Sequence, residues 1–510
     1  MSLYVQYSRL LWFILLLFSI SDSFSQKTTK IEIIAANSLE FDERLGKDVK
    51  RLLGDVQFRH DNALMYCDSA YFYSSSNTID AFNNIRIIQG DSLSLTGDKL
   101  NYNGNEKMAR MRGDVVLTHK GSILKTKFLD FDRAKNTGYY YNHGTITDQD
   151  NNLKSIRGYY YAKTNDFFSI DSVVLVNPKY TMYSDTLKYN TKTDISFFYG
   201  PTIIRSGDTS LIYCENGWYN TKTEISQYNK NAFVVNKEQK LKGDSLYYDR
   251  NNGIGKAFVN VELNDTVQKI ILRGNKAIYY EKPEKAYVTD KALMIQISEK
   301  DSSGYDSLYL HADTIRYDFD STNTYKIFRA YNHVKLFKSD LQGKCDSLSY
   351  SMQDSVIRLF HQPVIWAEES QLTAEAIQVF TKDNKVEKLV MTNAAFIISM
   401  EDSIRFNQMK GKTIVGHVRN NELYKIDITG NGQSVYFAKD DKDFIGANKA
   451  DCSDMIIYRK NKKFEKILFI SKPEATLFPV EQISQEDARL KDFQWLEKYR
   501  PKVWEDIFIW

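Results

Sequence analysis

Apolar and polar side chains alternate along most of this chain with the two-residue period of a β-strand that buries one face. In the segment Gly243–Tyr248 (GDSLYY), Leu246 and Tyr248 fall on one face, and Ser245 and Tyr247 fall on the other. Related segments carry Asn, Lys, Arg or Ser between the two apolar positions, so that face meets water. The pattern predicts short strands of about six residues, each burying a face of Leu, Ile and Tyr.

This segment is one copy of a six-residue phrase: a small residue, Asp, Ser or Thr, Leu or Ile, any residue, and Tyr. Its clear copies begin at Gly97, Ser184, Gly243, Ala312, Cys345 and Ser453. Weaker copies begin at Ala36, Cys67, Thr126, Cys214, Gly274, Ala374 and Gly411, and Arg157–Ala162 matches loosely. The starts at 36, 67, 97 and 126 lie 29 to 31 residues apart, which indicates a structural repeat.

A second phrase, a turn-like pair followed by a short apolar strand, runs in antiphase with the first. Its copies begin at Gly54, Asn83, Gly113, His143, Gly200, Asn332, Gln362 and Lys472, with a poorer match near Asn177. Each repeat therefore holds at least two strands with turn residues between them. One unit cannot bury its apolar face, whereas stacked units can. We predict an elongated all-β solenoid of about fourteen stacked repeats over residues 26–480.

The amino terminus predicts secretion. Arg9 precedes an apolar run of eleven residues from Leu10 to Ile20, and small and polar residues follow. This order is typical of a signal peptide over residues 1–25, cleaved after Ser25. The alternative, an uncleaved membrane anchor, is disfavoured because the run is shorter than the ~20 residues that span a bilayer.

Composition and charge support this class. The chain has 34 Tyr, 29 Phe and only 7 Pro, a balance that favours uninterrupted strand ladders. Its 68 basic and 65 acidic residues are well mixed, so no clustered basic face indicates nucleic-acid binding. The four cysteines lie too many repeats apart for disulfide geometry. We expect four buried free thiols that serve as small packing residues.

The recurring acid of the first phrase has two interpretations. It occurs as Asp98, Asp185, Asp244, Asp313, Asp346 and Asp454. A column of such carboxylates could bind Ca²⁺, or each could accept backbone N–H groups at a corner. Asn275, Glu215 and Lys127 interrupt the column, which favours the corner role.

The chain lacks the motifs of catalysis. The seven histidines show no metal-ligand spacing, and no GxSxG, P-loop or Rossmann phrase occurs, so we expect no enzymatic activity, metal or cofactor. A polysaccharide-cleaving β-helix would need grouped carboxylates, which we do not find. An outer-membrane barrel is disfavoured because Lys188 and Arg316 interrupt the outer row. A secreted adhesin or carbohydrate-binding solenoid shares the fold and remains the alternative function.

The signal peptide and the repeated GDxLxY and GDVxL phrases resemble the OstA-like, or LptA-type, family of lipopolysaccharide-transport proteins over nearly all of residues 31–480. The resemblance implies a V-shaped β-jellyroll with an apolar cleft that shields the acyl chains of lipid A. It implies a location in the periplasm, or peripheral to the outer membrane. It also implies end-to-end strand pairing with transport proteins of the inner and outer membranes. The implied groove lining is Leu100, Tyr102, Leu187, Tyr189, Leu246, Tyr248, Ile315, Tyr317, Leu348 and Tyr350, with Val115, Leu117, Val334 and Leu336 opposite.

The tail over residues 481–510 departs from the repeat. Glu486–Arg500 has helical spacing of apolar residues, and Pro501 ends the pattern. We predict a helix that caps the last repeat, and the alternative is a docking segment for a membrane partner.

Overall fold

The computed structural model describes residues 29–510 except 42–43, 45, 208–209, 237, 298–306, 320–325, 352, 383–384, 420–421, 441–442 and 461–462. The predicted signal peptide lies outside the described residues. The chain forms two compact units. Unit 1 holds the described residues up to Pro178 together with Thr186–Lys192, and unit 2 holds Lys179–Asp185 and Thr193–Trp510.

Unit 1 is built from antiparallel strands, with β14 shared between the units. These strands are β1 (Glu32–Ala35), β2 (Ser38–Phe41), β3 (Val49–His60), β4 (Ala63–Tyr73), β5 (Thr78–Gln89), β6 (Leu93–Asn103), β7 (Met108–His119), β8 (Ser122–Asp132), β9 (Thr137–Tyr140), β10 (Gly144–Asp148), β11 (Asn151–Ser155), β12 (Arg157–Tyr161), β13 (Asp166–Asn177) and β14 (Tyr180–Asn190).

Unit 2 repeats the same antiparallel pairing. Its strands are β15 (Ile195–Ser206), β16 (Ser210–Asn220), β17 (Ile225–Val235), β18 (Gln239–Asp249), β19 (Ile254–Asp265), β20 (Ile270–Glu281), β21 (Glu284–Gln296), β22 (Leu308–Phe319), β23 (Lys326–Lys338), β24 (Leu341–Ser351), β25 (Val356–Phe360), β26 (Val364–Ala367), β27 (Ser370–Thr373), β28 (Ala376–Lys382), β29 (Lys385–Met400), β30 (Phe406–Arg419), β31 (Glu422–Asp440), β32 (Asp443–Lys460), β33 (Lys463–Ile470) and β34 (Glu474–Phe478). Two 3-10 helices follow, η2 (Glu497–Tyr499) and η3 (Trp504–Phe508).

At Gly54, Asn83, Gly113, Gly200 and Asn332 the turn-like pair of the second phrase is a bulge inside one strand, so the expected turn between two strands is wrong there. The copies at 143, 177, 362 and 472 do lie between two strands, as predicted. In β5, Asn83 and Asn84 have φ of 60° and 46°, and the register with β6 shifts there by one residue. The left-handed pair bends the strand, while the residues on both sides continue the ladder. The predicted short strands are therefore halves of longer strands, such as the 12-residue β5 and the 11-residue β6.

The bends divide each unit into two walls that share their strands. In β5, residues 78–82 lie in wall B and residues 85–89 lie in wall A. The two halves of β8 show the division directly, because the first half pairs with β10 and the second half pairs with β9. The hairpin turns at the free edge of wall A form rim A, and the hairpin turns at the free edge of wall B form rim B. The inward faces are apolar, which confirms the predicted all-β jellyroll.

The carboxylate of the first phrase lies at the bend, opposite the bulge of an adjacent strand. Asp98 Oδ2 accepts the backbone N–H of Asp114 at 2.9 Å, and Asp454 Oδ1 accepts that of Gly430 at 3.0 Å. Asp244 accepts a bond from the side chain of Asn260 at 3.0 Å. The corner interpretation, in which the carboxylate accepts a backbone N–H, is confirmed for Asp98 and Asp454. Within the described residues, no three His, Cys, Asp or Glu side chains are grouped to hold a metal ion.

The first position of the phrase is small because the bend brings the next strand against it. A Cβ atom on Gly97 would lie 2.6 Å from Met111 Cγ, and one on Gly411 would lie 2.5 Å from Ile428 Cγ2. Cys67, Cys214 and Cys345 occupy the same position in other repeats. All four cysteines are buried free thiols, as predicted, and burial raises the pKa of these three to about 12.

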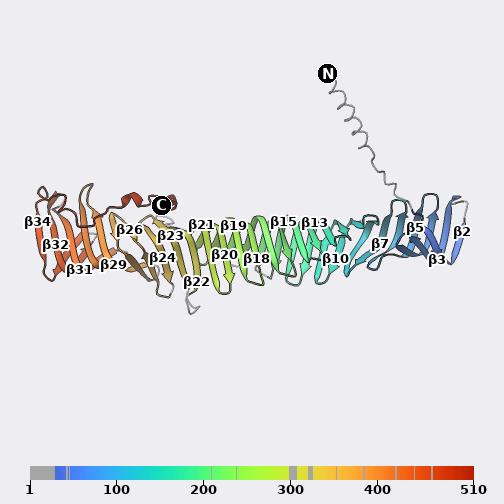
Figure 1. Cartoon of the computed structure of the whole chain (residues 1–510), viewed down its shortest axis with the longest axis horizontal. Helices are drawn as coiled ribbons and strands as arrows, with labels where there is room; N and C mark the ends of the chain where they lie inside the picture. Colours follow the sequence, from blue (N-terminus) through green and yellow to red (C-terminus); the bar gives the residue numbers. More distant parts are fainter. Residues whose placement is uncertain are drawn as a thin grey trace, which may run out of the picture. The chain divides into compact units, whose positions relative to one another are not determined.

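The carboxyl-terminal tail does not form the predicted helix. Apart from η2 and η3 it consists of isolated turns, at 480–482, 485–488 and 491–492, joined by irregular segments. It runs back along the outer face of wall A instead of capping the last strands (Figure 1). Buried glutamines bind its backbone. Gln408 contacts Ala488 O and Leu490 N, each at 2.8 Å, and Gln371 contacts Gln494 O and Leu496 N, each at 2.7 Å. These bonds replace those that a helix would make within itself. No described helix is long and apolar enough to cross a membrane.

We expect Gly113→Ala to destabilise unit 1 more than Gly121→Ala, by about 1–3 kcal/mol. Both glycines have positive φ, 101° and 92°, but the new Cβ at 113 would lie 2.2 Å from Asp98 Oδ2, whereas the one at 121 has no atom within 4 Å. Urea unfolding, with hydrogen exchange of β6 and β7, measures the difference. Equal losses in the two variants would contradict the proposed crowding at the bend.

Candidate functional site

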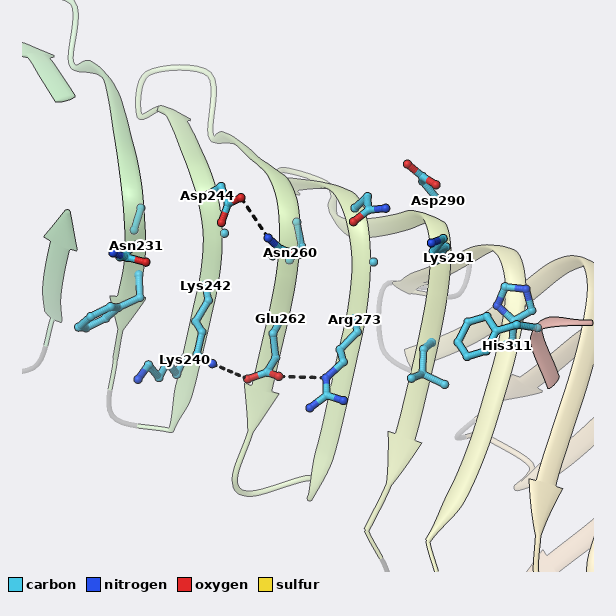
Figure 2. A pocket seen from close by; sticks show the side chains of 18 of the residues that line it. Asn231, Lys240, Lys242, Asp244, Asn260, Glu262, Arg273, Asp290, Lys291 and His311 are labelled. Carbon is cyan, nitrogen blue, oxygen red and sulfur yellow. Dashed lines mark hydrogen bonds and ion pairs between the residues drawn. The ribbon is translucent and has the colours of Figure 1, made fainter. Parts of the chain in front are cut away.

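An outer hollow and the interior are the two candidate binding surfaces. The hollow lies on the outer face of wall A in unit 2 and encloses about 1380 Å³ (Figure 2). Its centre is a chain of ion pairs, because Glu262 contacts both Lys242 and Arg273 at 3.0 Å. Phe508 of the tail closes one end. Cationic and acidic side chains line it in equal number, so the hollow has no net charge preference. None of the predicted lining residues faces it.

The predicted lining residues lie on the inward faces of the walls. In unit 1, these side chains are packed almost completely out of contact with water. Each is at most 3% exposed, and the set comprises Leu100, Tyr102, Val115, Leu117, Leu187 and Tyr189. The interior of this unit is therefore a closed core.

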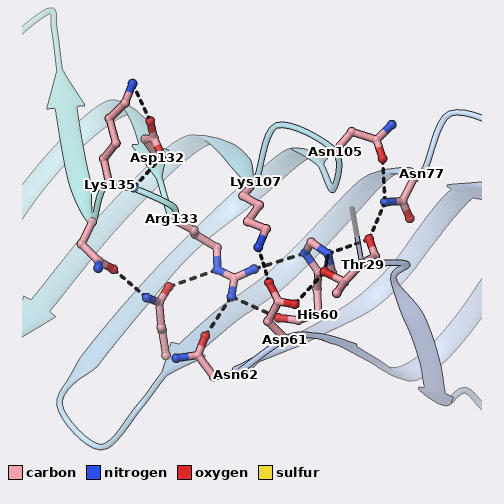
Figure 3. A network of polar contacts seen from close by, with 12 residues as sticks. Thr29, His60, Asp61, Asn62, Asn77, Asn105, Lys107, Asp132, Arg133 and Lys135 are labelled. Carbon is pink, nitrogen blue, oxygen red and sulfur yellow. Dashed lines mark hydrogen bonds and ion pairs between the residues drawn. The ribbon is translucent and has the colours of Figure 1, made fainter. Parts of the chain in front are cut away.

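A network of polar bonds closes the space between the two rims of unit 1 (Figure 3). His60 at rim A and Tyr102 at rim B share a hydrogen bond of 2.5 Å between Nδ1 and the hydroxyl. Arg133, in a rim B turn, donates to the Tyr102 hydroxyl at 2.6 Å and to the His60 carbonyl at 3.1 Å. Lys107 pairs with Asp61 across the same gap at 2.8 Å.

The network continues along the unit. Gln89 donates to Asn136 at 2.6 Å, and the Tyr189 hydroxyl donates to Asp148 at 2.7 Å. His119 bonds to the Tyr160 hydroxyl. We call this set the polar seam, and it comprises His60, Asp61, Gln89, His119 and Asp148 on rim A with Tyr102, Lys107, Arg133, Asn136, Tyr160 and Tyr189 on rim B. Sequence reasoning assigned Tyr102 and Tyr189 only to an apolar lining and gave Tyr160 no role, because the hydroxyl partners lie about 40 residues away.

Burial sets the charge states in the polar seam. Burial is the largest effect on His60, and it lowers the pKa of this side chain. A hydrogen bond with the Thr29 backbone and the charge of Asp61 raise this pKa, whereas the charges of Arg133 and Lys107 lower it. Burial and Lys120 likewise lower the pKa of His119. Hydrogen bonds from Lys107 and Thr29 lower the pKa of Asp61 to about 2. At neutral pH the seam therefore holds neutral histidines and an ionised Asp61.

The interior of unit 2 is less closed. Near its start Lys179 and Glu224 still pair from rim to rim. From β18 onward, Leu246, Ile315, Val334, Leu336 and Leu348 are buried, whereas the phrase tyrosines are half-buried, namely Tyr248, Tyr317 and Tyr350. Tyr248 donates to Glu281 at 2.5 Å and Tyr317 donates to Glu284 at 2.7 Å, and all four residues belong to rim B.

Half-buried apolar side chains extend this surface along both walls. On wall B, Phe328 is the register partner of both Tyr317 and Tyr350, so the three form a continuous row. Others pack on the core from wall A, namely Leu272, Met294, Leu308 and Leu341. We call these half-buried residues, together with Tyr248, the unit 2 groove.

A family model described as "OstA-like protein" matches residues 28–185 and 186–294, together just over half of the chain. No curated protein matches the chain. Among solved structures, the chain is similar to LptH, the LptA homologous periplasmic component of the conserved lipopolysaccharide transport device from Pseudomonas aeruginosa. That match has 13% identity and a TM-score of 0.16, and it covers 30% of this chain and 81% of LptH.

We expect unit 1 to lose stability as the pH falls from 7.5 to 5. The pKa values of His60 and His119 are lowered in the folded state from the ordinary 6.5. Their contribution is therefore complete above about pH 6.5 and is lost as the pH falls through the folded values. Asp61, with its pKa near 2, stays ionised in this window. Hydrogen exchange of β3 and β7, corrected for intrinsic rates, measures the effect.

The double variant His60→Gln, His119→Gln supplies the control, because it removes the two histidines of the polar seam. Its exchange in β3 and β7 should vary much less between the two pH values. A variant with the full pH dependence of the wild type would contradict the assignment to these histidines.

Proposed function

The chain belongs to the OstA-like protein family, and we propose that it is a non-enzymatic lipopolysaccharide-transport component of the periplasm. In this proposal the unit 2 groove shields the acyl chains of lipid A from water. The observation that carries it is the row of half-buried apolar side chains Tyr317, Phe328 and Tyr350 on adjacent strands. Membership of the family supports the cargo.

The chemistry of this groove suits an acyl chain. Apolar surface removed from water contributes ~25 cal/mol per Å² without any specific polar contact. Strand pairing places equivalent side chains on neighbouring strands, ~4.8 Å apart. A hydrocarbon chain therefore meets similar sites at short intervals and can move between them across small barriers.

The first and last strands support the proposed pairing with transport proteins of the inner and outer membranes. β1 and β2 each pair with β3, and Ile34, Leu39 and Phe41 are 43–57% exposed. At the other end, Leu477 of β34 is 68% exposed. Unprotected edge strands with apolar side chains are templates for strand addition from another chain. A position peripheral to the outer membrane is part of the same proposal, with the tail as a candidate docking segment.

One observation favours the alternative of a secreted carbohydrate-binding solenoid. Tyr139 and Tyr159 lie 4.9 Å apart on the outer face of wall B in unit 1, and Tyr159 stacks with the exposed Tyr161. Exposed aromatic rings of this kind can bind sugars. However, these rings pack on one another, which occupies much of their faces, so we prefer the lipid carrier.

Photo-crosslinking tests the groove with a pair of adjacent tyrosines. Tyr248 faces the groove and Tyr247 faces outward, where Lys256 approaches its ring. With benzoylphenylalanine at each position in turn, we expect lipopolysaccharide adducts at 248 and at the inward Tyr317, and at least tenfold fewer at 247. Equal labelling at 247 and 248 would contradict the proposal that acyl chains bind in the groove. Labelling of the outer tyrosines by glycans, with none at 248, would support the alternative.

A further inference from the structure

The two units use the repeated tyrosine differently. In unit 1, Tyr102, Tyr160 and Tyr189 are at most 2% exposed, and their hydroxyls bond to groups on the opposite rim. In unit 2, Tyr248 and Tyr317 are half-buried and donate to glutamates on their own rim. The tyrosine side chains therefore join the two rims in unit 1, whereas in unit 2 they leave apolar surface accessible.

We propose that the polar seam is a latch, so that acyl chains bind in the unit 2 groove while unit 1 admits them only after the seam opens. This inference rests on the proposed function and adds to it the place where lipid binds and the contacts that control access. Unit 1 contains the same kind of apolar lining, namely Leu100, Val115 and Leu117, but the seam separates that lining from water.

The seam can open without breaking the strand ladders. Every bond described for it is made by at least one side chain at a rim, whereas the backbone bonds of the strands run within wall A or within wall B. Each strand that crosses from wall A to wall B does so at a bend, where bulge residues such as Asn83 and Asn84 adopt left-handed backbone. Separation of the rims is then a rotation about the bends that exchanges side-chain bonds for bonds to water.

The groups that face one another also suit a latch. His60 lies on rim A and faces Tyr102 and Arg133, which lie on rim B. Asp61, Lys107 and Thr29 lie beside His60. These bonds join polar groups that water can satisfy equally well, so their loss on opening leaves no permanently unpaired group. If the contacts between the rims were apolar, their separation would expose those apolar side chains to water.

Two native thiols report on opening without any lipid. Cys67 lies in the core of unit 1 and Cys345 lies in that of unit 2, and both are buried. The triple variant Tyr102→Phe, Tyr160→Phe, Tyr189→Phe removes the three hydroxyls and keeps the rings. We expect about tenfold faster maleimide labelling of Cys67, measured by peptide mass mapping, with Cys345 unchanged.

The matched control is Tyr248→Phe, Tyr317→Phe, Tyr350→Phe, which makes the same chemical change in unit 2. It should leave the labelling of Cys67 unchanged. Unchanged labelling of Cys67 in the seam variant would overturn the latch. An equal increase at Cys345 would also overturn it, because that result indicates general loosening of the fold.

A lipid experiment separates this inference from the proposed function. Benzoylphenylalanine replaces either the buried Phe131 in unit 1 or Tyr317 in unit 2, and purified lipopolysaccharide is the probe. With the seam intact we expect adducts at 317 and none at 131, and with the seam variant we expect adducts at both. The labelling rate of Cys67 verifies that the replacement at 131 has not itself opened the seam.

Each other outcome has a distinct meaning. Adducts at both positions with an intact seam would refute the latch and leave the lipid carrier standing. Adducts at 317 alone in the seam variant would also refute the latch. If neither position is labelled under any condition, the proposed function fails, and the latch fails with it.

Discussion

The bend at the left-handed bulge is the feature on which the rest of the structure depends. An antiparallel strand can turn sharply and keep its neighbours only if the extra residue is absorbed locally, as Asn83 and Asn84 do in β5. Because most long strands bend in this way at their middle, one ladder becomes two walls with a common inner space. The small residue at the bend and the carboxylate opposite the bulge then follow, because the first avoids a clash and the second satisfies a backbone N–H that the bulge frees.

The inner space takes two forms although its lining is similar throughout. Leu, Ile, Val and Tyr face inward in both units, but rim contacts decide whether water or a ligand can reach them. In unit 1, His60 and Asp148 lie where the tyrosine hydroxyls of the other wall can reach them, and Arg133 of rim B donates to the His60 carbonyl on rim A. In unit 2, Glu281 and Glu284 draw the hydroxyls of Tyr248 and Tyr317 along one rim. A few polar residues at strand ends therefore decide whether the interior of a unit is a closed core or an accessible groove.

The tail shows a different way to use apolar periodicity. Leu490, Phe493 and Trp495 have spacing that suits a helix, yet they pack on the outer face of wall A with Phe406 and its neighbours. The buried amides of Gln408 and Gln371 supply the backbone partners of the tail. Tertiary bonds thus outweigh a local preference for helix, which is weak in a segment this short.

The sequence by itself determined the all-β class, the repeat, the inward face of each strand, the corner role of Asp98 and the burial of the four cysteines. These features follow from alternation and from residue size, which act between near neighbours and are visible in the chain. Only the tertiary structure decided that Gly113 and Asn83 begin bulges inside strands, that the tail does not form the expected helix, and that His60 bonds to Tyr102. The physical reason is distance along the chain: His60 and Tyr102 are 42 residues apart, and Gln371 and Leu496 are 125 apart. Such partners are chosen by how the walls are placed in space, and a two-residue period carries no information about that placement.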